Sequence, residues 1–215
     1  MLLTQGAQKI MYKGTAIQLT QRGRPALSAI VFSLLLSACA SSVSPPARYV
    51  LPSNQPSTAP QTPKAELSIN AVNLAHYLDV EGIIMQLDDI EMHEAREHQW
   101  AESLDRQLAR NLRDDLATAL KEAQVVNGPA GSNDALTLQL NVDAFHGRHD
   151  GYAVASGQWQ LRNAQNTLLH LDRFQTQTAL TDDGYPALVR ALDRNWASVA
   201  RGIATTLTQS GYLPE

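Results

Sequence analysis

Apolar and polar residues alternate most clearly from Leu136 to Val142, where four apolar positions are separated by Thr, Gln and Asn. This period of two predicts a strand with one face in a core. Similar but shorter or weaker alternation predicts further strands within residues 66–78, 82–95, 152–162 and 167–178. The side that carries the apolar residues changes within the segment 152–162, so we expect a bulge at Gly157.

Two other segments have a helical period. Apolar residues recur every four positions from Trp100 to Leu120, and a second stripe runs from Leu188 to Leu207 through Trp196. Both patterns predict amphipathic helices, and we expect the two tryptophans to lie in the core. Strands and two long helices in this order predict an α/β fold, with a mixed β-sheet and two main amphipathic helices packed on it. We expect a single compact domain over residues 67–213.

The N-terminal region has the layout of a secretory signal. Basic residues up to Arg24 precede thirteen mainly apolar or small residues, 26–38. As a helix this run would span about 20 Å, less than the roughly 30 Å of a bilayer's hydrocarbon core. We therefore expect a cleaved signal peptide over residues 1–38, with Met11 as an alternative start to Met1.

Cys39, the only cysteine of the chain, directly follows this run. Leu36, Ser37, Ala38 and Cys39 match a lipobox, in which the cysteine sulfur takes a diacylglyceryl group before cleavage. Two or more acyl chains hold a protein stably on a membrane. Residue 40 is Ala and not Asp, which by the usual sorting rule directs a lipoprotein to the inner leaflet of the outer membrane. A lone cysteine also excludes an intramolecular disulfide.

Residues 39–66 have the composition of a tether. They hold six of the ten prolines and are rich in Ser, Thr, Gln and Asn, which is typical of an extended segment without a core of its own. The stretch "RYVL", residues 48–51, interrupts this polarity, and we expect a short strand there that docks on the domain.

The charge of the chain changes sign after the signal. Residues 1–38 carry +4, and the rest carries 13 − 21 = −8. Nucleic-acid binding needs clustered Lys and Arg that neutralise phosphates, so we expect no nucleic-acid partner.

Candidate chemistry is sparse. His93 and His98 are five residues apart, which suits neither one face of a helix nor one face of a strand, and we expect two exposed histidines without metal. His146, His149 and Asp150 lie close together between two strands. They could hold a metal or serve a hydrolase, but such residues are also usual in a hairpin turn.

Asp182 and Asp183 precede Gly184 and the second helical stripe. They lack the alternating oxygen ligands of a calcium loop, so we expect them to cap the helix. We expect no catalytic residue, no metal and no cofactor other than the covalent lipid on Cys39.

The order of these features resembles one family, the ABC-type transport auxiliary lipoproteins. The resemblance covers residues 34–209 and rests on the lipobox, on "RYVL" with Tyr49 and Leu51, and on "WAESL" from Trp100 to Leu104, which we expect to open the first helix. The last two are packing signatures and not catalytic motifs.

This resemblance implies a function. Members are outer-membrane lipoproteins that work with MCE-domain proteins and their inner-membrane permease, with phospholipid as a further partner. The resemblance implies a ring-like homo-oligomer that docks the far end of the MCE tube and supports envelope integrity. Two alternatives stay open: a lipoprotein with another structural or assembly role, and a metal-binding or hydrolytic lipoprotein.

Overall fold

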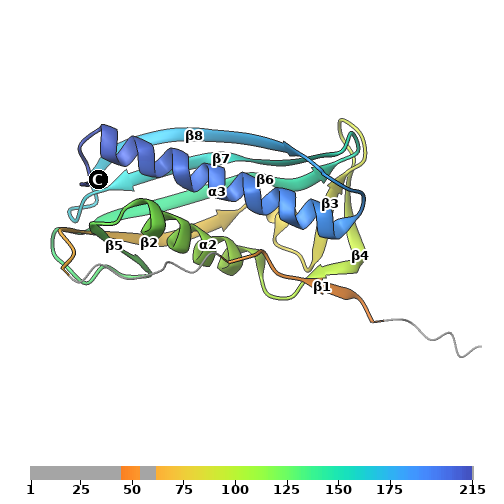
Figure 1. Cartoon of the computed structure of the whole chain (residues 1–215), viewed down its shortest axis with the longest axis horizontal. Coiled ribbons are helices and arrows are strands. Elements are labelled where there is room, and N and C mark those ends of the chain that lie inside the picture. The colour runs from red at the N-terminus through yellow and green to blue at the C-terminus, as the bar shows by residue number, and fades with distance from the viewer. Residues whose placement is uncertain (1–44, 54–61, 215) are drawn as a thin grey trace, which may run out of the picture. The chain divides into compact units, whose positions relative to one another are not determined.

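The computed structural model describes residues 45–53 and 62–214 and shows one mixed sheet with two long helices on one of its faces (Figure 1). The predicted α/β fold is therefore confirmed. The helices are α2 (Leu104–Ala119) and α3 (Tyr185–Gln209), and a short 3₁₀ turn, η2, covers His76–Leu78. The strands are β1 (Ala47–Tyr49), β2 (Ala65–Leu74), β3 (Gly82–Gln86), β4 (Met92–Trp100), β5 (Ala123–Asn127), β6 (Leu136–Arg148), β7 (Tyr152–Arg162) and β8 (Leu168–Ala179).

Strand β6 organises the sheet because it is long enough to pair with two shorter strands along one edge. Its first half pairs in parallel with β2, and Gly147 and Arg148 at its end pair in parallel with β3. Beyond β2 lies β5, and beyond β3 lie β4 and then β1. The other edge of β6 carries the antiparallel strands β7 and β8. The sheet thus has two branches. The branch that ends in β1 contains the described strand that follows Cys39 most closely in the sequence.

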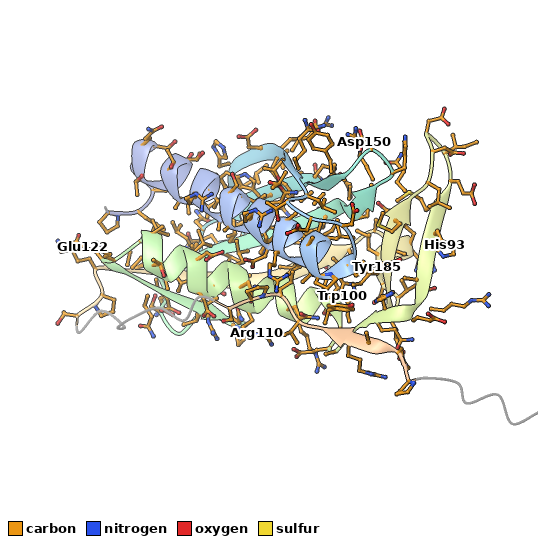
Figure 2. The ribbon with its side chains drawn as sticks, turned by 45° about the vertical axis from the view of Figure 1, so that its right-hand side comes forward. His93, Trp100, Arg110, Glu122, Asp150 and Tyr185 are labelled. Atoms are coloured by element: carbon orange, nitrogen blue, oxygen red, sulfur yellow. The ribbon has the colours of Figure 1, made fainter. Side chains whose placement is uncertain are left out.

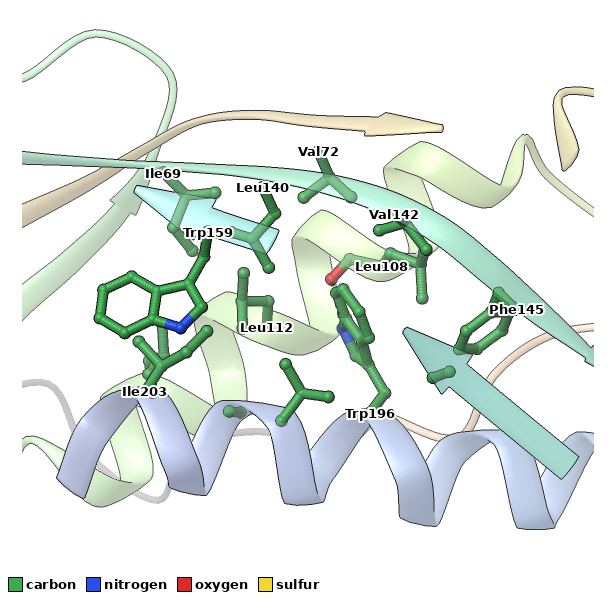
Figure 3. Close-up of a cluster of buried hydrophobic side chains, with 14 of the residues drawn as sticks. Ile69, Val72, Leu108, Leu112, Leu140, Val142, Phe145, Trp159, Trp196 and Ile203 are labelled. Atoms are coloured by element: carbon green, nitrogen blue, oxygen red, sulfur yellow. Dashed lines mark hydrogen bonds between the residues drawn. The ribbon is translucent and has the colours of Figure 1, made fainter. Parts of the chain in front are cut away.

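The core lies between the sheet and the two helices. Every leucine of the predicted stripe on α2 is buried, and Trp196 of α3 is fully buried. Figure 3 shows Trp196 between α2 and the sheet, close to Phe145. Its indole Nε1 donates a hydrogen bond to the Leu108 carbonyl of α2 at 2.9 Å, and its ring meets Phe145 edge-on at 6.0 Å. One side chain therefore links both helices and β6, and the prediction that Trp196 lies in the core is confirmed.

Trp100 is also buried, but it does not belong to a helix. It is the last residue of β4, and α2 begins four residues later at Leu104. The prediction that "WAESL" opens the helix is thus wrong for its first four residues, since only Leu104 belongs to α2 and Ser103 is its N-cap residue. The four-residue spacing from Trp100 to Leu104 arises because both side chains enter the same core across the turn between β4 and α2.

The irregularity predicted near Gly157 lies on the neighbouring strand. The register shifts between Val142 and Ala144 of β6, so Asp143 is the extra residue, while Gly157 pairs opposite Val142. Strand β7 itself keeps one inward face throughout. Its inward positions near Tyr152 are the small residues Ala153 and Ala155, which is why the sequence suggested a change of side.

Candidate functional site

Residues 47–53, here called the N-terminal strap, are bound to the domain before the chain reaches β2. Their first part is β1, which pairs in parallel with the end of β4 from Ala47 opposite His98 to Tyr49 opposite Trp100. The Tyr49 carbonyl then accepts a hydrogen bond from the Ala101 amide at 2.8 Å. Leu51 follows and is only 2% exposed, which places its side chain in the core. The strand expected at residues 48–51 is thus present, but it covers Ala47–Tyr49 and ends two residues earlier than expected.

Three polar side chains of α2 hold the second part of the strap. Gln107 Oε1 accepts a hydrogen bond from the Leu51 amide at 2.8 Å. Asn111 Nδ2 donates a hydrogen bond to the Pro52 carbonyl at 2.6 Å. Asp114 Oδ2 accepts a hydrogen bond from Ser53 Oγ at 3.0 Å. Positions 107, 111 and 114 share one face of a helix. All three side chains are buried, so their hydrogen bonds to the strap replace bonds to water.

Charge is concentrated beneath the strap. The buried Asp114 carboxylate accepts a hydrogen bond from Arg113 Nε at 2.9 Å. The positive guanidinium offsets the cost of burying the carboxylate charge. On α3, burial and the nearby Asp115 raise the pKa of Asp193 to about 6. The Asn111 Nδ2 atom lies 3.5 Å from Asp193 Oδ1, and this contact lowers that pKa only in part. The stability of the folded domain therefore depends on pH through the ionisation of Asp193.

An aromatic cluster holds β1 from the other side. Tyr49 Oη lies 2.9 Å from His98 Nδ1, and the His98 ring stacks on Tyr185 at the start of α3 with 3.9 Å between centroids. Burial, and to a lesser degree Tyr49, raise the pKa of Tyr185. His98 is half-buried, so the expectation that it is exposed is wrong, whereas His93 is exposed. The pairing of β4 with β3 is irregular between Glu94 and Gln99, so the two histidines lie on either side of a break in the alternation of the strand.

A hollow of about 370 Å³ lies beside the strap, and Arg48, Trp100 and Leu104 line it together with residues of the loop before β3. Figure 2 shows Trp100 and Tyr185 close to β1. The residues that carry the family resemblance, Tyr49, Leu51, Trp100 and Leu104, are thus brought together around one feature, the attachment of the strap.

The candidate metal cluster is not assembled. His146 is buried on β6, where burial lowers its pKa and its Nδ1 lies 3.1 Å from the Gly147 carbonyl. His149 is exposed in the β6–β7 turn. Asp150 is bound by Arg148, which holds the pKa of that carboxyl below its usual range. Within residues 45–53 and 62–214, no three His, Cys, Asp or Glu side chains converge as they would around a metal ion.

The expected cap of the last helix is absent. Gly184 occupies the N-cap position of α3 with φ of 91°, and no side chain caps the helix there. The prediction that Asp182 and Asp183 cap it is therefore wrong. Glycine adopts this left-handed backbone without the strain that a side chain would introduce. Both aspartates are exposed.

Sequence reasoning missed Gln107, Asn111 and Asp114. A signal exists, because these polar residues lie beside the buried leucines of α2 and not on its far face. On a helix that is exposed on one side, however, polar residues next to an apolar stripe are usual. Only the position of the strap shows that they are buried.

The lipobox residues Leu36, Ser37, Ala38 and Cys39 lie outside the described residues. Among the helices that the structure does describe, none is both long and apolar enough to cross a membrane.

Comparison with known proteins supplies the remaining observation. Residues 49–204 match the model of a family described as the ABC-type transport auxiliary lipoprotein component. The chain is 34% identical over 177 residues to the intermembrane transport lipoprotein PqiC of Escherichia coli K12, covering 81% of this chain and 92% of that protein. The PqiC of Shigella flexneri matches with the same identity and coverage.

Two solved structures have a similar fold. A crystal structure of an uncharacterized protein superposes with a TM-score of 0.68 and 31% identity, and the match covers 76% of this chain and 99% of the other. A protein from Xanthomonas campestris superposes with a TM-score of 0.57 at 14% identity, over 79% of this chain and 97% of the other, which shows likeness of fold alone.

Proposed function

The chain belongs to the ABC-type transport auxiliary lipoprotein family, and from this premise we propose that it is the outer-membrane component that receives the periplasmic tube of an MCE-type transport system. The family and the PqiC relatives, which are named intermembrane transport lipoproteins, establish that the chain is a transport-associated lipoprotein of the cell envelope. The membrane, the partner and the docking role are the proposal. In this role the protein binds and positions a partner and catalyses no reaction.

Anchoring is the first element of the proposal. Cys39 carries the acyl chains, and these hold the protein on the inner leaflet of the outer membrane, facing the periplasm. No other lipid attachment is needed, because two or more chains suffice for stable anchoring.

The strap carries the proposal, because it sets how far the domain can stand from that membrane. If the fold began only at β2, its first residue, Ala65, would lie 26 residues after Cys39, with a reach of about 90 Å at full extension. The strap is already fixed at Ala47, only eight residues after Cys39, so the reach falls to about 30 Å. The domain therefore stays near the membrane, and the partner must cross the periplasm to reach it.

The partner in this proposal is an MCE-domain protein joined to an inner-membrane permease. Several copies of the chain form a ring that meets the end of the tube, and phospholipid is the transported or bound molecule. The mixed sheet supports this role because it offers a rigid body between the strap and the loops at its ends.

A metal-binding or hydrolytic role is the weaker alternative. It would need His146, His149 and Asp150 to converge, and the first is buried while the third is bound to Arg148. A structural role at the cell wall or at an assembly machine fits a tethered domain as well, and only the identity of the partner separates it from transport.

The test is affinity purification of the lipidated protein from gently solubilised membranes, with Cys39→Ser as the matched control. Proteins and lipids that purify with it are identified by mass spectrometry. We expect an MCE-domain protein with the natural chain and its loss with Cys39→Ser. Cell-wall or barrel-assembly proteins in its place would contradict the proposal.

A further inference from the structure

Three loops meet at one end of the molecule and form what is here called the end surface. They are the β3–β4 loop (87–91), the β6–β7 turn (149–151) and the β8–α3 loop (180–184). Backbone hydrogen bonds join them: the His149 amide donates to the Gln86 carbonyl, and the Leu180 amide donates to the Gly151 carbonyl, both at 2.9 Å. Figure 1 shows the β3–β4 loop and the β6–β7 turn side by side at this end.

Apolar side chains are exposed on and beside the end surface. Ile90, at the tip of the β3–β4 loop, is 87% exposed. Leu87 and Met92 at the ends of the same loop, and Tyr152 directly after the β6–β7 turn, are between 36% and 44% exposed. These are four of the eight large hydrophobic side chains that are exposed in the described part of the chain. Exposed apolar side chains that gather in one region of a surface often mark a binding site.

An apolar hollow lies on the same end. It has a volume of about 140 Å³ and is lined by Met85, Leu180, Gly184, Tyr185 and Leu188. Its size suits one aliphatic side chain. The end surface thus offers a partner two apolar contacts: the exposed Ile90 side chain and a hollow that can take an aliphatic side chain.

Carboxylates surround these apolar groups. Asp88, Asp89 and Glu91 lie in the β3–β4 loop, and Asp182 and Asp183 lie in the β8–α3 loop. None of the five is ion-paired with a Lys or Arg in the described residues, whereas Arg148 is already bound to Asp150. The end surface therefore combines exposed apolar side chains with carboxylates that have no cationic partner among the described residues.

The Asp88 carboxylate also fixes the shape of the tip. Its Oδ1 accepts the amides of Ile90 at 2.9 Å and Glu91 at 2.7 Å, which lowers the pKa of Asp88. These bonds hold Ile90 in its exposed position, so less conformational entropy is lost when a partner covers it.

We propose that the end surface is the docking site for a protein segment that presents an aliphatic side chain flanked by Lys and Arg. Electrostatic complementarity requires the positive flanks, since like charges across an interface are unfavourable. Pairing with the end surface of a second copy is disfavoured, because the carboxylates of the two β3–β4 and β8–α3 loops would then face each other. An anionic membrane surface is disfavoured because it would face the same carboxylates. This inference rests on the proposed function, in which the segment belongs to the MCE-domain partner.

The test measures binding of the purified lipidated chain, in detergent, to its MCE-domain partner at about 50 mM and about 300 mM salt. Ile90→Ser removes the central contact and should weaken binding at least about tenfold. The double variant Asp89→Asn, Asp183→Asn should weaken binding and reduce its dependence on salt. Leu171→Ser is the matched control, because Leu171 is 56% exposed on β8, outside the end surface, and should leave binding unchanged.

The outcomes separate the two claims. If the partner does not bind the natural chain, the proposed function fails. If it binds and Ile90→Ser binds equally well with an unchanged melting temperature, the docking site is elsewhere and the inference is overturned. A change in oligomeric state caused by Ile90→Ser would also overturn it, because a second copy would then cover the end surface.

Discussion

Replacing Leu51 with Ala should detach the strap from the domain, and the size of the effect follows from its burial. Leu51 is 2% exposed and packs in the core, while its amide is bound by Gln107. Truncation of a buried leucine to alanine costs about 2–5 kcal/mol. The strap lies at the rim of the core and can move inward to fill part of the space, so we expect about 2–3 kcal/mol. This corresponds to a rise of about 30- to 150-fold in the population of detached strap.

Hydrogen exchange on the chain from residue 40 onward measures this population. Two amides report on it: that of Leu51, bound to Gln107 Oε1, and that of Ala101, bound to the Tyr49 carbonyl. Both should exchange faster in Leu51→Ala by about the factor given above, because they exchange when the strap opens. Val50→Ala is the matched control, since Val50 is 57% exposed, and it should change stability by less than about 0.5 kcal/mol.

Two results would refute this reasoning. If both amides already exchange freely in the natural chain, the strap is not held and the reach from Cys39 is not limited to eight residues. If Leu51→Ala leaves exchange and urea denaturation unchanged, the buried leucine does not fasten the strap.

Three further predictions concern the core and the charge beneath the strap. The pKa of Asp193 is raised to about 6, so its ionisation lowers stability as pH rises from about 4 through 6. Asp193→Asn should therefore stabilise the protein by roughly 1–2 kcal/mol at about pH 8, allowing for partial solvent screening, and little at about pH 4; a difference that does not vary with pH in urea denaturation would contradict this. Trp196→Phe keeps a ring in the core but loses the hydrogen bond to the Leu108 carbonyl, and should cost about 1–3 kcal/mol in thermal unfolding. A loss below about 0.5 kcal/mol would show that the bond contributes little. Gly157→Ala would bring a Cβ into the Asn141 carbonyl and should destabilise by more than about 1 kcal/mol, whereas Gly202→Ala, with open space around it on α3, should stabilise by about 0.5–1 kcal/mol. Equal melting temperatures for these two variants would argue against the close approach of β6 and β7.

Local periodicity was sufficient for most elements of the fold. The strand from Leu136 and the helix through Trp196 were predicted because long stripes of one period leave little ambiguity. Trp100 was assigned to the wrong element because one residue at a helical spacing cannot show where the helix begins. The N-cap of α3 was misassigned because a glycine with positive φ at that position replaces side-chain capping.

The candidate site was harder to predict, since tertiary contacts create it. Gln107 and Asn111 are ordinary helix residues until the strap lies on them. The end surface joins loops that are far apart in sequence, and the parallel pairing of β3 with the end of β6 brings the first two together. No single stretch of sequence contains that information.

The parallel pairing of β1 with β4 also determines how the protein bears mechanical force. Under the proposed function, a tube that pulls on the domain while acyl chains hold Cys39 would load the chain at β1 before it loads β2. A force directed along β1 would shear the hydrogen bonds to β4 and the contacts of the strap with α2 together, and would not open them one after another. Such an attachment suits a part that must stay folded between a moving machine and a fluid membrane.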